Sequence, residues 1–320
     1  MTAAVEAAAP RPADVAALFR AHERALFGLA LRLTGCGADA DEVVQETFVR
    51  ALATPPARTD EPWAPWLVRV ATNLALDVLR RRRRRRDPSW LPSPLACDEG
   101  KAALELPAPR EHTADSRYER LESATFAFLL ALEALTPRQR AALVLRDVCG
   151  YSAGETSAAL GISEANVRVQ HHRARRALAA YDRAPCRPDA ALAARTRGAL
   201  EAFVARLYAN DVAGLEALLR DDVRTTTDAG GEFNAMKGVR AGRVGVLRFH
   251  LRVAQRRGAA ARIVPCLLNG LPALAITFAS AGPRQAPRVL LRCDVDAEGR
   301  IAAIHSVLAT RKLAGVRFDA

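Results

Sequence analysis

The sequence predicts a multidomain chain in which two all-α domains precede an α+β domain. Residues 14–86 and 117–182 carry apolar residues at helical spacing, with few glycines or prolines inside the helical stretches. Residues 87–116 between them contain five prolines and several acidic residues, which is typical of a linker. Within residues 192–316, two amphipathic helices give way to short apolar runs broken by Gly and Pro, which indicate strands. A chain of 320 residues is also too long for a single core.

Composition excludes several classes of protein. No run of roughly 18 apolar residues occurs, so we expect no membrane span. The N-terminus lacks the basic and apolar regions of a secretory signal. The six cysteines are scattered, without a C-x-x-C pair or clustering with histidine, which argues against zinc and against a disulfide framework. We therefore expect no metal, no cofactor, no membrane partner and a reducing, cytoplasmic location.

The distribution of charge points to a polyanionic partner. The formal net charge is +12 and the isoelectric point is near 10.3. Seven consecutive arginines at 80–86 form one basic locus on an otherwise mildly acidic N-terminal part. Residues 190–320 hold 20 Lys and Arg against 11 Asp and Glu, a net charge of +9.

Residues 152–178 have the layout of a helix–turn–helix. A short helix of small residues at 152–160 is followed by Gly161, which can adopt the positive φ of a tight turn. Ser163 is a good N-cap for a second, longer and more basic helix.

The second helix of this motif has an inward and an outward face. Val167, Ala174 and Leu178 fall in one apolar stripe, with His171 at its border. A basic outward face can reach base edges and phosphates in a major groove, and the alternative is an ordinary solvated surface. The residues of the outward face are Arg168, Val169, His172, Arg173 and Arg176.

Residues 39–52 predict an amphipathic helix with an acidic and amide-bearing outer side. The inward side consists of Val44, Phe48, Ala51 and Leu52. The outer side consists of Glu42, Gln45, Glu46 and Val49.

Residues 66–86 predict a further helix that runs into the arginine block. Its apolar positions are Leu67, Val70, Leu74 and Val78, and its polar positions are Arg69, Asn73 and Asp77. The preceding loop contains Trp63 and several prolines. Trp63 and Trp66 are either core residues or stacking platforms for an extruded base.

Together these motifs resemble a known family. Residues 39–86 are similar to region 2, and residues 135–178 to region 4, of bacterial extracytoplasmic-function (group IV) RNA polymerase sigma factors. The order of the motifs also matches, and the resemblance covers about residues 14–182. It implies a non-catalytic subunit that binds core RNA polymerase through its β′ and β subunits and directs it to promoter DNA.

The resemblance implies roles for individual residues. Docking on a coiled coil of β′ would involve Asp41, Glu42, Gln45 and Glu46. Recognition and opening of the −10 element would involve Arg69, Asn73, Asp77, Arg80, Arg81, Arg82 and Arg83. Binding of the −35 element would involve Arg168, Val169, His172, Arg173 and Arg176. Val169 and Gln170 depart from the family's usual Val-Lys-Ser-Arg pattern, so the −35 preference does not transfer.

Residues 192–316 resemble the SnoaL-like extension that a subset of these sigma factors carries. The matching segments are 215–219 with Asp222-Val223, then 228–231, 269–274 and 299–304, together with Trp90-Leu91-Pro92 in the linker. The resemblance implies an α+β cone-shaped barrel of curved sheet wrapped by helices. Two signatures diverge, because Asp-Gly-Gly-Gly appears as Asp228-Ala229-Gly230-Gly231 and Asn-Pro-Asp-Lys-Leu appears as residues 309–313. Docking that depends on these signatures would be altered.

Two functions remain open for this extension. The first is regulation by a small-molecule or protein effector, in which the linker contacts the extension and restrains the DNA-binding domains. The residues of that contact would be Trp90, Leu91, Pro92, Asp228, Gly230 and Gly231. The second is isomerase or cyclase activity with Asp228 as base, assisted by His250 or His305. An acid–base pair inside a cavity would favour the second.

Overall fold

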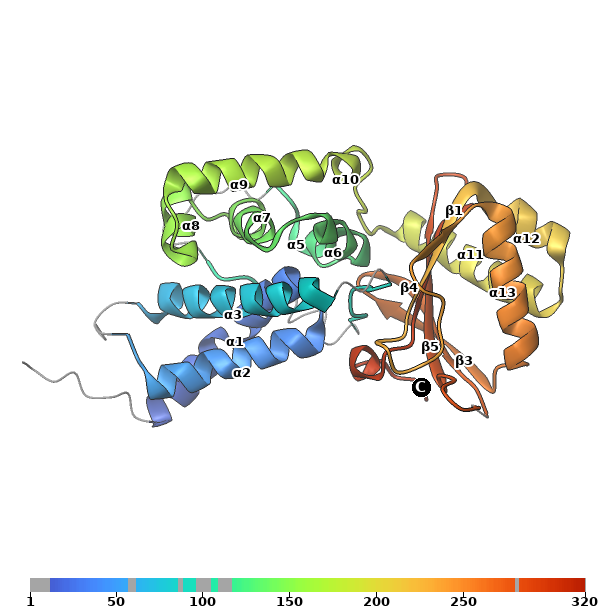
Figure 1. Cartoon of the computed structure of the whole chain (residues 1–320), viewed down its shortest axis with the longest axis horizontal. Coiled ribbons are helices and arrows are strands. Elements are labelled where there is room, and N and C mark those ends of the chain that lie inside the picture. The colour runs from blue at the N-terminus through green and yellow to red at the C-terminus, as the bar shows by residue number, and fades with distance from the viewer. Residues whose placement is uncertain are drawn as a thin grey trace, which may run out of the picture. The chain divides into compact units, whose positions relative to one another are not determined.

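The computed structural model describes residues 12–56, 62–85, 89–95, 105–108, 117–279 and 282–319. They belong to two compact units (Figure 1). The N-terminal unit comprises residues up to Arg85 and 101–186, and the C-terminal unit comprises 86–100 and 187–320. The expected linker is therefore divided, and its first part belongs to the C-terminal unit.

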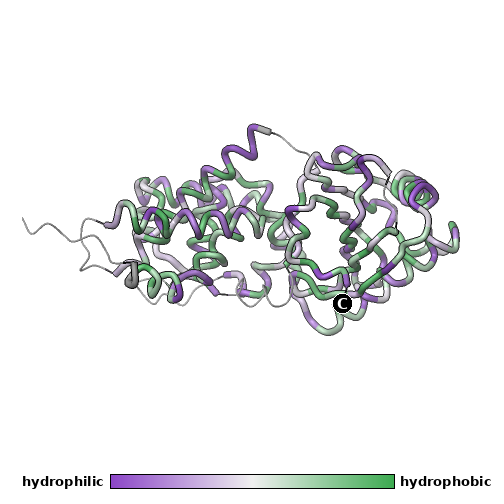
Figure 2. Tube along the Cα trace, turned by 90° about the horizontal axis from the view of Figure 1, so that it is seen from below, coloured by the Kyte–Doolittle hydropathy of each residue, from purple (hydrophilic) through white to green (hydrophobic). Residues whose placement is uncertain are grey.

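Three long helices form the first bundle of the N-terminal unit. They are α1 (Pro12–Thr34), α2 (Gly37–Ala53) and α3 (Trp63–Arg85). Gly35, with a φ of 69°, turns the chain between α1 and α2. Hydrophobic residues, green in Figure 2, recur along these helices and supply the buried core.

One position of α2 differs from the prediction. Val44, Phe48 and Ala51 are buried as expected, but Leu52 is 47% exposed. Leu52 lies about 100° around the helix from Ala51, which takes it out of the arc that faces α1 and α3.

Short, well-capped helices form the second bundle. They are α5 (Arg120–Ser123), α6 (Phe126–Ala131), the 3-10 turn η1 (Leu132–Ala134), α7 (Pro137–Leu143), the π-helical turn η2 (Val144–Val148), α8 (Ala153–Leu160), α9 (Glu164–Ala177) and α10 (Ala179–Arg183). Capping boxes begin α7 at Thr136 and α8 at Ser152. Gly161 ends α8 with a φ of 62°, and Ser163 caps α9. The predicted helix–turn–helix is confirmed.

Charged side chains tie the two bundles of this unit together. Arg140 is 1% exposed and donates hydrogen bonds to the carbonyl oxygens of Leu33 and Leu132, at 3.0 and 3.1 Å. It also pairs with the carboxylate of Glu133, which accepts from Arg82 of α3 at 2.6 and 2.8 Å. Burial lowers the pKa of Arg140, and Glu133 acts in the opposite direction. A buried guanidinium needs such partners, so this network fixes α3 against α7.

The C-terminal unit is an α+β domain. Its helices are α11 (Ala190–Tyr208), α12 (Val212–Leu218), α13 (Arg243–Arg257) and the short η3 (Thr310–Leu313). Its strands are β1 (Leu219–Asp228), β2 (Val239–Ala241), β3 (Arg262–Leu268), β4 (Leu271–Thr277), β5 (Arg288–Val295) and β6 (Ile301–Val307). They form one sheet in the order β2-β1-β6-β5-β4-β3, in which only β1 and β6 run parallel.

Helices α11, α12 and α13 cover one face of this sheet (Figure 1). Alternate strand residues point to that face, and they meet Phe203 of α11 and Val246 of α13 in one apolar core. Leu274, Leu291 and Ile304 are the central strand residues of this core.

The sheet is open rather than closed. Among the described strands, β2 pairs with β1 alone and β3 with β4 alone, so the sheet has two edges. The α+β class is confirmed, but the expected barrel does not close. β2 has only three residues, and helices rather than further strands complete the cover of the core.

Candidate functional site

Helix α9 presents a basic face to solvent. The Oγ of Ser163 accepts a hydrogen bond from the N–H of Asn166, which fixes the start of the helix. Val167, Ala174 and Leu178 are buried, as the pattern predicts. The five residues of the predicted outward face are exposed, namely Arg168, Val169, His172, Arg173 and Arg176.

Polar contacts hold α9 in place and reduce its free charge. The Nε2 of His171 lies 2.7 Å from Oδ1 of Asp147, which joins α9 to η2. Arg168 donates to Glu164 at 2.8 Å, one turn earlier. Arg173 and Arg176 have no such ion pair among the described residues, so they are the arginines of this face available to an external anion.

The outer face of α2 is exposed and rich in carboxylates and amides. Asp41, Glu42, Gln45 and Glu46 all lie on the solvent side of the helix. Glu46 pairs with Arg50 at 3.0 Å, one turn later. This face can bind a basic surface on a protein partner.

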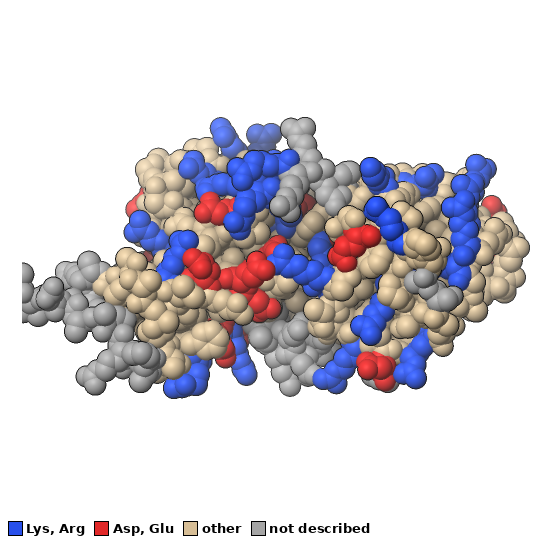
Figure 3. All heavy atoms as spheres, turned by 60° about the horizontal axis from the view of Figure 1, so that its bottom comes forward, with Lys and Arg blue, Asp and Glu red and all other residues tan. Residues whose placement is uncertain are grey.

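The polar face of α3 is exposed, and its arginine block is not uniform. Arg69, Asn73 and Asp77 point to solvent, and Asp77 pairs with Arg80 at 2.6 Å. Arg81 and Arg83 are exposed, whereas Arg82 is half-buried against Glu133. Basic side chains, blue in Figure 3, gather on one part of the N-terminal unit beside acidic ones. Arg86 lies outside the described residues.

Trp63 and Trp66 lie at the start of α3. Their rings make an edge-to-face contact with centroids 5.8 Å apart, and both residues are half-buried. They are therefore partly packed and partly accessible.

The linker residues Ser89–Leu95, which we call the strap, pack on the C-terminal domain. The buried carboxylate of Asp228, 1% exposed, accepts a hydrogen bond from the N–H of Leu91 at 2.8 Å and from Nζ of Lys312 at 2.5 Å. Lys312 also donates to the carbonyl oxygen of Leu91 and lies 4.1 Å from the ring centroid of Trp90. Leu91 and Pro92 are buried. One lysine thus holds both a backbone segment and an aromatic ring.

Further hydrogen bonds fix both ends of the strap. The Oγ of Ser89 accepts from the N–H of Gly238 at 2.7 Å. At the other end, Leu95 donates to the side-chain oxygen of Asn269 at 3.1 Å and accepts from its N–H at 3.0 Å. Asn269 has a φ of 50° in the turn between β3 and β4, a conformation that Asn tolerates.

The glycines after Asp228 shape the turn beside this contact. Gly230 and Gly231 have φ values of 58° and 77°, and both are exposed. A Cβ on Gly230 would lie 3.0 Å from the Cβ of Ala309. Ala229 is not among the residues with a positive φ, so this position does not require glycine. The divergent signatures keep the side chains that hold the strap.

Lys312, Ser89 and Asn269 are functional candidates that the sequence reasoning missed. Lys312 falls in a segment that differs from its expected signature, but it occupies the lysine position of that signature, and this was the available signal. Ser89 and Asn269 act through single hydrogen bonds at turns, which leave no periodic pattern.

Two of the candidate acid–base residues, Asp228 and His250, lie on opposite faces of the sheet. Asp228 is held by Lys312 on the sheet face opposite the helices, because it lies three residues beyond Thr225, which faces them. His250 of α13 lies on the helix side, where its Nε2 is 3.1 Å from Oγ1 of Thr225 and burial lowers its pKa to about 4. The Nε2 of His305 is 3.1 Å from the carboxylate of Asp294.

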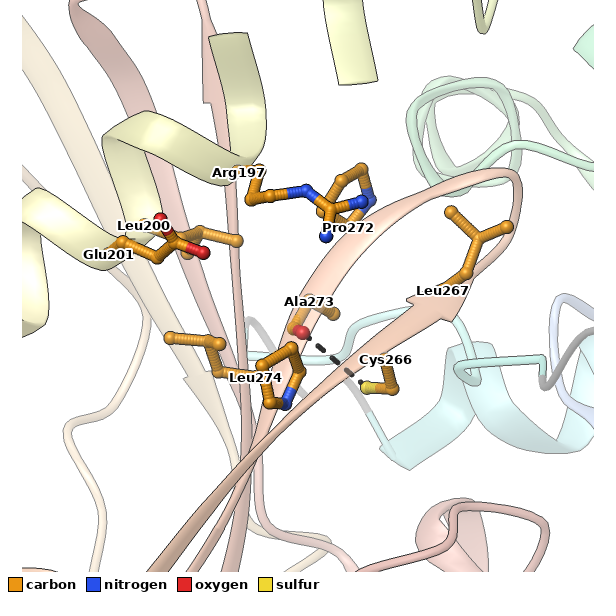
Figure 4. A pocket seen from close by; sticks show the side chains of 9 residues that line it. Arg197, Leu200, Glu201, Cys266, Leu267, Pro272, Ala273 and Leu274 are labelled. Carbon is orange, nitrogen blue, oxygen red and sulfur yellow. Dashed lines mark hydrogen bonds between the residues drawn. The ribbon is translucent and has the colours of Figure 1, made fainter. Parts of the chain in front are cut away.

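One pocket of the C-terminal domain, of about 190 Å³, lies between α11 and the β3–β4 hairpin (Figure 4). Its wall is mainly apolar, with Arg197 and Glu201 one turn apart on α11. The thiol of Cys266 donates to the carbonyl oxygen of Ala273 at 3.5 Å. None of the three candidate acid–base residues lines this pocket. The enzyme alternative is therefore not favoured.

The described residues show neither a membrane-spanning helix nor a metal-binding group. No helix among them is both long and apolar enough to cross a membrane. No three His, Cys, Asp or Glu side chains in the same ranges are grouped so that they could hold a metal ion.

The fold and the exposed faces define a sigma-70-type transcription factor. Two family models match the helical bundles: sigma-70 region 2 over residues 18–85 and sigma-70 region 4 over residues 125–178. The ECF RNA polymerase sigma factor SigJ of Mycobacterium tuberculosis is 35% identical over 248 residues, 75% of this chain and 73% of that protein. SigG of the same species is 32% identical over 324 residues, 95% of this chain and 84% of that protein.

A solved structure agrees over nearly the whole chain. The crystal structure of Mycobacterium tuberculosis SigJ has a TM-score of 0.70 at 26% identity and covers 95% of this chain and 100% of that one. The chain belongs to the extracytoplasmic-function family of RNA polymerase sigma factors. Its sigma regions identify a transcription factor that binds RNA polymerase and promoter DNA and directs transcription initiation.

Replacing Lys312 with Met should loosen the strap. The substitution removes two charge-assisted hydrogen bonds and leaves the Asp228 carboxylate buried without its cation. The loss of a hydrogen bond to a charged group costs about 1.5–3 kcal/mol, which corresponds to exchange of the Leu91 amide that is faster by roughly 10- to 100-fold. Hydrogen-exchange mass spectrometry of the peptide that contains the strap measures this change.

The matched control is Arg195→Met, which removes an exposed cation of the same domain at a position that makes none of the strap contacts described above. Its strap should exchange as in the wild type. Equal protection of Leu91 in the Lys312→Met variant would contradict the assignment.

Proposed function

We propose that the C-terminal domain regulates this sigma factor by holding the strap. The observation that carries the proposal is the buried Asp228 carboxylate, which binds Leu91 and Lys312 together. In sequence the strap lies between regions 2 and 4, so the domain holds part of the segment that must span them. While the seven residues of the strap are bound to the domain, they cannot extend, so the distance that the segment between regions 2 and 4 can span is reduced.

The contacts between the two helical bundles support a restrained state of the free protein. Arg82 is one of the arginines that we assign to the −10 element, and here it pairs with Glu133. Promoter DNA therefore has to compete with Glu133 for this side chain. Polymerase would favour an open state only by its differential affinity for that state, and release of the strap lowers the affinity required.

We assign core-polymerase docking to the outer face of α2, through Asp41, Glu42, Gln45 and Glu46. The exposed carboxylates suit a basic coiled coil of the β′ subunit, and region 4 is the second point of contact, on the β subunit. A cytoplasmic location follows from this partner. A small-molecule or protein effector that binds the C-terminal domain would act by changing the stability of the strap.

We assign DNA recognition to two exposed helical faces. The polar face of α3, with Arg69, Asn73 and Asp77, reads the −10 element, and Arg80, Arg81 and Arg83 neutralise the adjacent backbone together with Arg82 once it leaves Glu133. The outward face of α9 reads the −35 element, with Arg173 and Arg176 as the principal contacts and Arg168, Val169 and His172 beside them.

Replacing Glu42 and Gln45 with Lys should weaken binding to core polymerase by at least 10-fold. Both side chains lie on the exposed face, so the charge reversal opposes a basic partner without disturbing the helix core. Affinity for core polymerase, with helical content from circular dichroism, measures the effect. The double control Glu216→Lys and Gln255→Lys makes the same change in charge on the C-terminal domain and should bind normally. Normal binding by the α2 variant would place the docking face elsewhere.

Replacing Arg173 or Arg176 with Ala should weaken binding of the −35 element by about 1–3 kcal/mol if the arginine makes a bidentate base contact. A phosphate contact would instead weaken all sequences similarly and reduce the salt dependence. Holoenzyme binding to promoter variants at several salt concentrations separates the two. Arg183→Ala, which removes an exposed arginine of α10, is the control. If neither substitution changes promoter binding at any salt concentration, α9 is not the recognition helix.

Replacing Trp90 with Ala should change transcription in the same direction as removing the C-terminal domain after Tyr181. Both changes free the strap, because the ring of Trp90 lies against Lys312. Run-off transcription with core polymerase on genomic fragments measures the effect. A truncation that alters activity while Trp90→Ala has none would show that the strap takes no part in regulation.

A further inference from the structure

The solvent-facing side of α13 is a row of arginines. The helix contains five Arg and no Asp or Glu. Val246, Leu247 and His250 are buried against the sheet. Arg248, Arg252 and Arg256 recur every four residues on the opposite side, with Cα atoms about 6 Å apart along the axis. We call these three residues the arginine row.

The other two arginines of α13 make contacts within the domain, whereas those of the row do not. Arg243 donates to the carbonyl oxygen of Leu219 at 3.1 Å and pairs with Asp221 at 2.7 Å. Arg257 donates to a backbone carbonyl oxygen, and its guanidinium lies 3.9 Å from the ring centroid of Phe278. The three arginines of the row are exposed and make no ion pair or hydrogen bond with any described residue.

The row also lacks local neutralisation. Like charges four residues apart on a helix repel, and α13 offers no carboxylate to offset the repulsion. On the packed neighbours, Asp221 of β1 is taken by Arg243, and Glu216 of α12 is an exposed acid without an ion pair among the described residues. On the face shown in Figure 3, the C-terminal unit carries many basic side chains and few acidic ones. This surface suits an extended anion with regularly spaced charges.

A short connection ties region 4 to the C-terminal domain that carries the row. Helix α10 ends at Arg183 and α11 begins at Ala190, so six residues connect region 4 to the C-terminal domain. Such a connection spans at most roughly 25 Å. With α9 in the −35 major groove, the domain would experience a high effective concentration of the flanking duplex.

We propose that the arginine row binds the phosphate backbone of duplex DNA next to the −35 element. The inference rests on the proposed reading of that element by α9. The contact is independent of sequence, because guanidinium groups bind phosphates without reading base edges. It adds up to three phosphate contacts to the footprint of the holoenzyme.

Full-length protein with Arg248→Gln, Arg252→Gln and Arg256→Gln tests the proposal, since Gln maintains the helix. Arg195→Gln, Arg197→Gln and Arg224→Gln form the control, which removes the same charge from exposed positions elsewhere on the domain. Two promoter fragments are compared, one that ends at the upstream edge of the −35 element and one that extends about two helical turns beyond it, roughly 20 base pairs. The holoenzyme should bind the longer fragment at least 10-fold more tightly, and the row variant should lose this gain.

The salt dependence gives a second readout. On the longer fragment, the slope of log K against log salt should fall by about 2–3 in the row variant, at roughly 0.9 per phosphate. The control should keep both the gain and the slope. Equal gain in the row variant, or equal loss in the control, would overturn the proposal.

Two other results would distinguish a DNA contact of the row from a protein contact and from the proposed reading of the −35 element by α9. Weaker binding of the row variant to core polymerase itself, with the gain for the longer fragment retained, would show that the row contacts protein and would overturn the DNA assignment. A wild-type holoenzyme that bound no promoter through α9 would sink the proposed −35 reading. In that case, binding of the free full-length protein to an arbitrary 40-base-pair duplex still tests the row, because the row variant should bind it at least 10-fold more weakly.

Discussion

The buried pair of Asp228 and Lys312 is the contact on which the arrangement of the C-terminal domain depends. A carboxylate that is 1% exposed is costly unless several donors surround it, and here Lys312, Leu91 and Gly230 supply them. These donors come from the last turn of the chain, the linker and the turn after β1. The Asp228 carboxylate thus joins three segments that are far apart in sequence. A displacement of any one of them would leave the buried carboxylate without one of its donors. The first part of the linker is therefore a structural part of this domain.

Local signals in the sequence predicted the helical bundles well. Ser163 and Gly161 act through hydrogen bonds and a φ value within a few residues of their own position, so the helix–turn–helix could be read directly. The exposed faces of α2 and α9 followed from helical periodicity in the same way. The burial of Arg82 could not be read, because its partner Glu133 is 51 residues away and has no periodic relation to it. The closure of the sheet also depends on long-range strand pairing, and that expectation was wrong.

The divergent signatures show which features of a motif the structure requires. After Asp228, a positive φ occurs at Gly230 and Gly231 but not at Ala229, so alanine fits there without strain. Near the C-terminus, Lys312 supplies the charge, while Ala309 lies against Gly230 as a small packing residue. A comparison of sequences alone gives every departure from the two signatures the same weight. Physically, the charge and the two backbone conformations determine the contact, and both are present.

The open sheet leaves two strand edges, and both are poorly suited to pairing with another chain. β2 has only three residues, so it offers few backbone N–H and C=O groups to a strand of another chain. β3 carries Pro265 at its centre, where no N–H exists to extend the ladder. An unclosed sheet with long regular edges would invite edge-to-edge aggregation. The short strand and the proline disfavour such pairing. The sheet can therefore keep two open edges without promoting aggregation between copies of the protein.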